Sequence, residues 1–300
     1  LERVSHSRGG EGIRVLVLSK EGLSEDVDSC LGSDPRFDIF RLDVVRNKAL
    51  KAMASAFLPP DIDDSCYLSG KPEAAEGKRR YRAFLESFWP HLQRRLRADA
   101  VLSANFAYYA ERELAAVLEQ SGTPFVVLHK ENLKSPGRVD FFERVYRERR
   151  GPFHGRRILV YNEIERGLQI AAGVVTPDRV TVTGMPRLDR MHRWRRRTGA
   201  AAGKKSFDVP QVLFFSFDAK TGLPKLARKP GAGVEGGHEP LGEGMDDLSW
   251  SRLVRESHDA VVRFARERPD VRVVVKAKRN LPEQSPVREI LKEPAPNLEV

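Results

Sequence analysis

Short apolar runs alternate with stretches of helical periodicity along this chain, and the clearest example covers residues 158–191. There the pattern predicts a strand, a helix, a turn, a second strand and the start of another helix. The apolar run 158–160 is typical of a buried strand. Asn162 can cap the following helix with its side-chain oxygen, and Gly173 can end that helix in the left-handed conformation. Residues 180–183 then alternate valine with threonine, as a half-buried strand does.

The same alternation occupies the chain before this stretch. Strand–helix–strand at this spacing is a parallel crossover unit, so the sequence predicts an α/β fold with a doubly wound sheet. The predicted strands cover residues 13–18, 37–44, 99–103 and 124–128, and the predicted helices cover 48–57, 73–97 and 105–120. Pro90 should kink the longest of these helices.

Three of the predicted helices have an apolar face that we expect to lie in the core. In the helix after Asn162 this face is formed by Ile164, Leu168 and Ala171. In the helix 73–97 it is formed by Tyr81, Phe84, Leu85, Phe88 and Leu92. In a further helix at 248–268 it is formed by Trp250, Leu253, Val261 and Phe264.

The composition changes after residue 193, where small and polar residues replace the arginines. Beyond this linker, apolar runs at 211–217, 271–275 and 298–300 predict strands of a second sheet. We therefore predict two Rossmann-like domains. The N-terminal domain covers residues 1–195, the linker 196–210, and the second domain 211–300. Because the chain begins with Leu and stops at its last predicted strand, we expect a fragment whose second domain is truncated.

Ligands of doubly wound sheets bind outside the carboxyl ends of the strands, so polar residues at those positions are the candidate site. His129, Lys130 and Glu131 close an apolar strand. His129 or Glu131 could act as a general base, and Lys130 could hold an anionic group. Asn105 and Asn162 follow the neighbouring strands and would line the same cleft. The alternative is that His129 is a hydrogen-bonded core residue and that Glu131 only starts a loop.

The second predicted domain has its own strand-end cluster. Ser216 and Asp218 follow its first strand, and Lys276, Lys278 and Arg279 follow its second. Backbone amides, hydroxyls and cations at such positions can bind a diphosphate and stabilise the charge that develops as it leaves. The alternative is a solvated basic strand end.

Net charge and missing motifs narrow the chemistry. A net charge of +10 favours an anionic partner. The chain lacks the Gly-x-Gly-x-x-Gly dinucleotide fingerprint, the Gly-Lys-Ser/Thr phosphate loop, the Gly-x-Ser-x-Gly elbow and metal-ligand spacing. Cys30 and Cys66 lie far apart, which fits structural thiols in a reducing compartment. No apolar run is long enough to span a bilayer, so we expect a cytoplasmic protein.

One segment resembles the end of the first domain in GT-B-type glycosyltransferases of bacterial surface-polysaccharide biosynthesis. It runs from Tyr161-Asn162 through Gly173-Val174-Val175-Thr176-Pro177-Asp178 to Thr183-Gly184-Met185-Pro186-Arg187-Leu188-Asp189. Similar wording occurs in sugar-nucleotide 2-epimerases and in glycerophosphotransferases of cell-wall polymers. His129-Lys130-Glu131 and Phe214-Phe215-Ser216-Phe217-Asp218 look closest to the glycosyltransferase branch. The resemblance covers roughly residues 100–280, and residues 1–98 match only in architecture.

This resemblance implies a metal-independent glycosyltransferase. It would move a sugar from a nucleotide sugar to a glycan or lipid-linked acceptor, with the nucleotide sugar as substrate and no separate cofactor. The first domain would hold the acceptor and the second the nucleotide, and the basic patches would suit peripheral contact with the inner face of a membrane. The rivals are a sugar-nucleotide 2-epimerase and a non-enzymatic basic module that binds a polyanion through the arginines of residues 190–197. No specific nucleic acid is expected as a partner.

Overall fold

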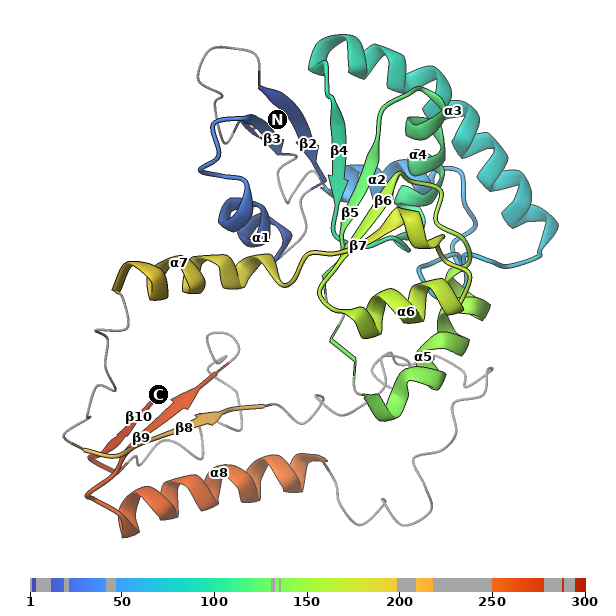
Figure 1. Ribbon diagram of the computed structural model, residues 1–300. Coiled ribbons are helices and arrows are strands. Elements are labelled where there is room, and N and C mark those ends of the chain that lie inside the picture. Colours follow the sequence, from blue (N-terminus) through green and yellow to red (C-terminus); the bar gives the residue numbers. More distant parts are fainter. Residues whose placement is uncertain are drawn as a thin grey trace. The chain divides into compact units, whose positions relative to one another are not determined.

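The computed structural model divides into two compact units, Leu1–Ala201 and Ala202–Val300. Figure 1 shows both, and each is described here by itself. The structure describes residues 2–3, 12–18, 22–41, 47–130, 133–134, 136–198, 209–217, 250–277, 288 and 295–300.

Unit 1 is built on a seven-stranded sheet with the order β1-β3-β2-β4-β5-β6-β7. Its strands are β1 (Glu2–Arg3), β2 (Ile13–Val17), β3 (Phe37–Arg41), β4 (Ala100–Ser103), β5 (Phe125–Leu128), β6 (Arg157–Val160) and β7 (Val180–Val182). The edge strand β1 is antiparallel to β3, and all other neighbours are parallel. The chain reverses its direction of winding between β2 and β4, which confirms the predicted α/β fold with a doubly wound sheet.

The helices of unit 1 alternate with these strands. They are α1 (Leu23–Cys30), α2 (Asn47–Ser55), α3 (Pro72–Leu96), α4 (Tyr109–Gln120), α5 (Val139–Val145), α6 (Glu163–Ala171) and α7 (Asp189–Thr198). Two local sequence signals of α6 are confirmed. The side chain of Asn162 accepts a hydrogen bond from the amide of Glu165, and Gly173 follows the helix with a φ of 69°.

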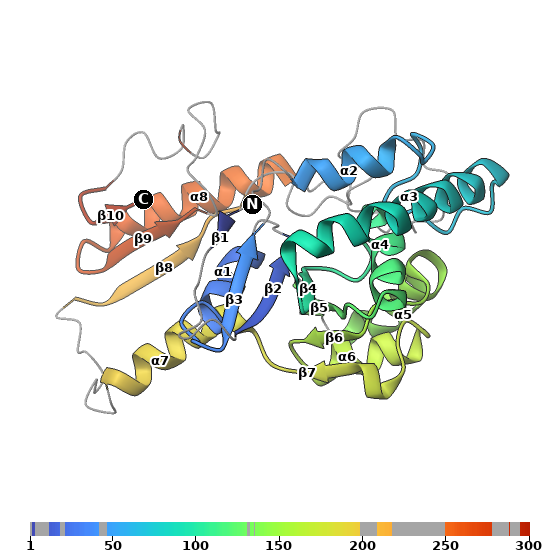
Figure 2. The same cartoon turned by 90° about the horizontal axis from the view of Figure 1, so that it is seen from above.

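The two faces of the sheet bury alternate residues of each strand. On one face Leu16 belongs to a large core that also contains side chains of α3, α4 and α6. On the other face Val15 and Val17 pack with Leu23 and Val27 of α1. The helices α3 and α4 lie side by side (Figures 1 and 2), and the hydroxyl of the buried Tyr81 in α3 donates to a backbone carbonyl of α4.

Three details of the predicted helices were wrong. Phe88 of α3 is 37% exposed and only stacks on Phe84 at the surface, so the predicted apolar face is too wide. Ile164 of α6 is 39% exposed, because the buried face is shifted by one residue and contains Glu165 and Leu168. Helix α4 begins at Tyr109 rather than at residue 105.

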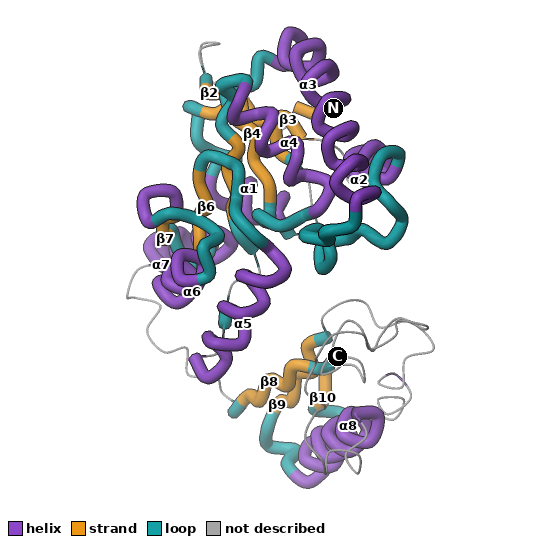
Figure 3. Tube along the Cα trace, turned by 90° about the vertical axis from the view of Figure 1, so that its right-hand side faces the viewer, coloured by secondary structure: helices purple, strands orange, loops and turns teal. Residues whose placement is uncertain are grey.

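Unit 2 contains a smaller parallel sheet with the order β10-β9-β8. Its elements are β8 (Gln211–Phe215), α8 (Trp250–Glu267), β9 (Arg272–Lys276) and β10 (Leu298–Glu299). Figure 3 shows α8 along one side of this sheet. The buried residues of α8 include Val254, His258 and Ala265, whereas the predicted face centred on Leu253, Val261 and Phe264 is only partly buried; the side chain of Trp250 lies outside the described part. None of the helices in the described ranges has the length and apolar character that a membrane span requires.

Candidate functional site

The carboxyl ends of the central strands of unit 1 are joined by backbone hydrogen bonds that continue beyond the strands themselves. The amide of His129 donates to the carbonyl of Leu159 in β6, with a distance of 2.9 Å between nitrogen and oxygen. The next amide, of Lys130, donates to the carbonyl of Ala104 after β4 at 3.0 Å. The polar segment that follows β5 is therefore fixed on both sides, and it brings the ends of β4, β5 and β6 together as the sequence predicted.

His129 forms a buried pair with Glu165 at this edge of the sheet. Its Nε2 lies 3.3 Å from Oε1 of Glu165, and the two residues are 3% and 0% exposed. Glu165 occupies the third position of α6, where the helix N-terminus favours negative charge. A carboxylate beside an imidazole fixes the orientation of the ring. The pair thus joins the end of β5 to the start of α6.

Two further side chains donate hydrogen bonds to the same oxygen of Glu165, whereas its Oε2 is buried without a hydrogen bond to any described residue. The Tyr146 hydroxyl and the Gln169 amide both donate to Oε1 at 2.9 Å. Burial raises the pKa of Tyr146, and the nearby charge of Glu165 raises it further, so Tyr146 stays a proton donor at neutral pH. The ring of Phe106 packs edge-on against His129 and Tyr146, with centroid distances of 5.1 and 5.4 Å. Such packing excludes water and strengthens the electrostatic interactions inside.

Sequence reasoning predicted His129 but missed Glu165 and Tyr146. Tyr146 begins a π-helical turn, Tyr146–Arg150, a form that is rare and often found at functional sites. The signal for Glu165 was its spacing, because Glu165 and Gln169 share the inward face of α6 with Leu168. Polar residues on the buried face of a short helix indicate a buried polar network.

The remaining predicted residues of this site have mixed positions. Oδ1 of Asn162 caps α6, and Oδ1 of Asn105 accepts a hydrogen bond from the amide of Ala107 in the turn before α4. The side-chain oxygens of both asparagines therefore stabilise the local backbone. Lys130, the next residue after His129, is partly buried. Glu131 lies outside the described residues.

A second buried ion pair crosses the same edge of the sheet and was not predicted. Arg187, in the short 3₁₀ turn after β7, donates from Nε and Nη2 to the two carboxylate oxygens of Asp26 in α1 at 2.9 and 3.0 Å. Asp26 is 0% exposed, and its hydrogen bonds raise the pKa of Arg187. Ser29 also donates to the carbonyl of Pro186 at 2.9 Å. These contacts attach the end of unit 1 to its first helix.

We expect Cys30, at the end of α1, to react slowly with alkylating reagents. Burial and then the charge of Asp189 raise the pKa of its thiol from 9.0 to about 11. Because the thiolate is the nucleophile, the reactive fraction at pH 8 should be about a hundredfold lower than in the unfolded chain. Iodoacetamide labelling followed by peptide mass spectrometry measures this rate in native and urea-unfolded protein. A native rate that levels off near pH 9 would contradict the raised pKa.

In unit 2 the structure brings two predicted phosphate-site residues together. The amide of Ser216 donates to the carbonyl of Lys276 at 3.0 Å, so both residues lie at the carboxyl ends of adjacent strands. Oγ of Ser216 lies 2.9 Å from Nε2 of the fully buried His258, whose Nδ1 lies 2.7 Å from the carbonyl of Val254. A carbonyl only accepts, so in the neutral ring Nδ1 donates and Nε2 accepts the proton of Ser216.

This arrangement changes what Ser216 can offer to a ligand. Its hydroxyl proton is used by His258, so its oxygen presents lone pairs, which suit a sugar hydroxyl better than a phosphate oxygen. Of the three basic residues predicted to bind the diphosphate, Lys276 lies within the described residues, and it is exposed. Asp218, Lys278 and Arg279 lie outside the described residues. Within the described ranges no group of three or more His, Cys, Asp and Glu side chains is placed to hold a metal ion.

Comparison with known proteins found likeness only in solved structures. No family model and no curated protein matches the chain. One similar structure is the UDP-GlcNAc 2-epimerase from Neisseria meningitidis, solved with UDP-GlcNAc bound. The match has a TM-score of 0.43 and 12% sequence identity, and it covers 95% of this chain and 71% of the epimerase chain. The match to the UDP-GlcNAc 2-epimerase from Methanocaldococcus jannaschii has a TM-score of 0.41 and 10% sequence identity. It covers 95% of this chain and 71% of the epimerase chain. Likeness at this level concerns the path of the chain and assigns no activity.

Proposed function

We propose that this protein is a metal-independent glycosyltransferase that moves a sugar from a nucleotide sugar to a glycan or lipid-linked acceptor in surface carbohydrate biosynthesis. The observation that carries the proposal is the buried His129–Glu165 pair, which lies where doubly wound sheets bind their ligands. Unit 1 holds the acceptor in this proposal, and unit 2 holds the nucleotide.

The chemistry requires removal of the acceptor hydroxyl proton as the new glycosidic bond forms. The strand end at residues 129–131 supplies the base, either as His129 or as Glu131. Glu165 stabilises the positive charge that His129 gains, and Lys130 attracts the anionic leaving group or acceptor. His129 is almost fully buried, so Glu165 also acts by holding the whole strand end in one position.

The products of the reaction test the proposal. The protein is incubated with a panel of nucleotide sugars, with and without a mixture of glycan and lipid-linked acceptors. Free nucleoside diphosphate that forms only when an acceptor is present supports transfer. Conversion of a nucleotide sugar into its C2 epimer without any acceptor would replace this proposal by the 2-epimerase. Salt-dependent retention on polyanions, with no turnover, would replace it by the basic module.

Replacement of Lys276 by alanine should weaken nucleotide binding by about 1.5–3 kcal/mol, the range for a hydrogen bond to a charged group. Lys276 ends β9 beside Ser216 and has an exposed side chain that can reach a diphosphate. Titration calorimetry with a nucleoside diphosphate measures the change. The matched control is Arg272→Ala, since Arg272 lies at the opposite end of the same strand and pairs with Glu299. Equal losses in both variants would show that only the overall positive charge matters.

A further inference from the structure

A second group of charged side chains lies away from the strand ends, where α3 and α4 meet two loops. Arg112 belongs to α4, and Lys78 and Arg82 belong to α3. Tyr67 comes from the loop before α3, and His154 comes from the loop before β6. None of these residues takes part in the His129–Glu165 site.

Arg112 is a buried cation that is only partly satisfied. The residue is 6% exposed, and its Nη2 donates to the carbonyl of Pro152 at 3.2 Å. Its guanidinium carbon lies 4.6 Å from the centre of the Tyr67 ring. The other terminal nitrogen, Nη1, is buried and makes no hydrogen bond to any described residue. Burial lowers the pKa of Arg112. A buried charge with an unused donor is costly, and an anion at Nη1 would remove that cost.

The carboxylate nearest to this cation is used by other partners. Glu113 accepts hydrogen bonds from the hydroxyl of Tyr67 on one oxygen and from Arg82 at 2.6 Å on the other. Lys78 has its ammonium nitrogen 4.4 Å from the centre of the same tyrosine ring, and no described carboxylate lies within ion-pair distance of it. Burial lowers the pKa of Lys78, and the positive charge of Arg112 adds to that shift, although Glu113 opposes it. The positive charges of Arg112, Lys78 and Arg82 therefore exceed the single negative charge of Glu113.

The outer rim of the cluster is open to solvent. His154 is exposed, and its loop is attached to Arg112 by the hydrogen bond from Nη2 to the carbonyl of Pro152, two residues earlier. Burial and then the charge of Arg112 lower the pKa of His154. The side chain of Arg82 is 40% exposed. Nη1 of Arg112 lies beneath this rim and is itself not exposed, so an anion reaches it only when the side chains of the rim move apart.

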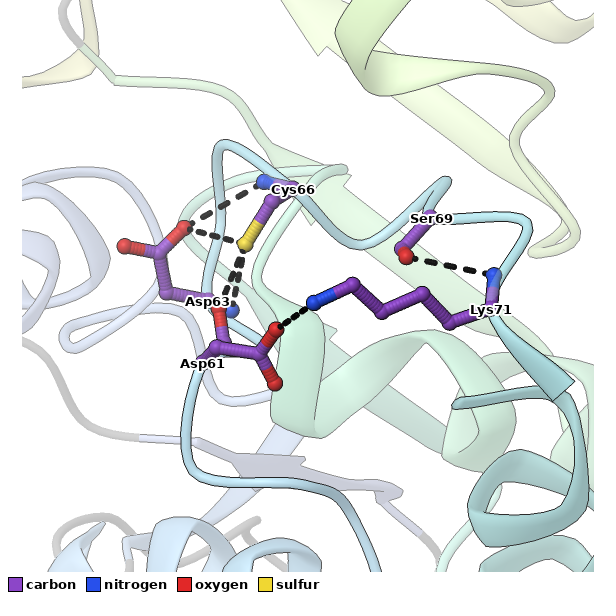
Figure 4. Close-up of polar contacts among 5 residues, drawn as sticks. All are labelled: Asp61, Asp63, Cys66, Ser69 and Lys71. Atoms are coloured by element: carbon purple, nitrogen blue, oxygen red, sulfur yellow. Dashed lines mark hydrogen bonds and ion pairs between the residues drawn. The ribbon is translucent and has the colours of Figure 1, made fainter. Parts of the chain in front are cut away.

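One wall of the cluster is held in shape by the hydrogen bonds drawn in Figure 4. Sγ of Cys66 donates to the carbonyl of Asp61 at 2.7 Å and to Oδ1 of Asp63 at 3.3 Å. Lys71 closes the loop by an ion pair with Asp61 at 2.7 Å. Tyr67 lies between these anchors in sequence, and its buried ring is held in place by the hydrogen bond from its hydroxyl to Glu113. A preformed wall reduces the entropy lost on binding.

We propose that Arg112, Lys78 and His154 form a binding site for a small oxyanion of the phosphate class, separate from the strand-end site. The anion accepts from the unused nitrogen of Arg112 and from the ammonium group of Lys78, and His154 closes the site from the solvent side. Guanidinium and ammonium groups together are a common combination for doubly charged oxyanions. The site does not depend on the proposed transfer reaction.

Binding of inorganic phosphate and of sulfate tests this site directly. Titration calorimetry and thermal unfolding are measured with each anion against sodium chloride at the same ionic strength, because simple screening affects all cations alike. Both anions should bind and raise the unfolding temperature progressively as their concentration increases. Glycerol phosphate is added as a third probe. Tighter binding of this ester than of inorganic phosphate identifies the ligand as a phosphoryl group on a larger molecule, and weaker binding identifies a free ion.

Substitutions locate the binding. Lys78→Gln should weaken the affinity for sulfate by about tenfold, which corresponds to the loss of one charge-assisted hydrogen bond. Arg112→Lys should weaken the affinity for sulfate at least as much. If the Arg112→Lys variant does not fold, the Lys78→Gln variant still tests the site. The matched control is Arg79→Gln, because Arg79 is the exposed neighbour in α3 and pairs with Glu76. The proposal is overturned if sulfate stabilises no more than chloride, or if the Lys78 and Arg79 variants bind sulfate equally well.

Discussion

Replacement of Arg187 by alanine should destabilise unit 1 by about 3 kcal/mol, because it leaves Asp26 buried without its partner. This value is at the lower end for a broken buried pair, since the Arg187 side chain is 36% exposed and water can partly reach the site that it leaves. The change in the free energy of unfolding of unit 1 is measured by urea unfolding, with hydrogen exchange of the amides in β2 as the probe.

Two controls separate the ion pair from general loss of charge. Arg190→Ala removes an exposed arginine of α7 and should change the free energy of unfolding by less than about 0.5 kcal/mol. A double variant, Asp26→Leu with Arg187→Met, should recover much of the lost stability, because an apolar pair of similar size has no buried charge to satisfy. The interpretation fails if Arg187→Ala behaves like Arg190→Ala.

Glu165→Gln should lower turnover by about a hundredfold or more, the scale expected for loss of a positioned acid–base group. The substitution keeps the size of the side chain but removes the carboxylate that lies 3.3 Å from Nε2 of His129. His129→Ala should cost a similar factor, and the double variant should lose little more, because residues that act as a unit are not additive. Steady-state kinetics with the nucleotide sugar that the donor panel selects measures all three.

The readout must distinguish catalysis from stability, since both residues are buried. Glu163→Gln is the matched control, because Glu163 is an exposed residue of the same helix turn. Near-ultraviolet circular dichroism should show the native signal in each variant. A loss of kcat with an unchanged circular dichroism signal assigns the effect to catalysis. Wild-type kcat in both Glu165→Gln and His129→Ala would remove this pair from the mechanism.

Local signals in the sequence were sufficient for most of the fold. The Asn162 cap and the left-handed Gly173 depend only on neighbouring residues, so they can be recognised without knowledge of the tertiary structure. Errors arose where tertiary packing decides. Phe88 is apolar and has the correct spacing, yet at that turn of α3 it is Trp89 that lies in the core while Phe88 is exposed. The start of α4 was misplaced because the side chain of Asn105 stabilises a turn instead of a helix.

A residue of the candidate site could be predicted only where its own position in the sequence pattern is unusual. His129 stands out because a polar residue ends an apolar strand, whereas its partner Glu165 is brought to it by the pairing of β5 with β6. Arg187 and Asp26 are separated by 161 positions, and no periodicity connects them. Arg112 gave no signal either, because an arginine within a helix is usually solvated. Contacts between distant segments are properties of the topology, which local patterns do not contain.

The contact between the 3₁₀ turn after β7 and α1 also has a consequence for the order of events during synthesis. Translation produces α1 early, but Asp26 and Ser29 acquire their partners Arg187 and Pro186 only after almost the whole unit has left the ribosome. Until then, the charge of Asp26 opposes burial of the helix, so α1 gains little from docking on the nascent sheet. Contacts of such long sequence separation are also slow to form. We therefore expect the amino-terminal helix to be among the last elements to become protected during cotranslational folding.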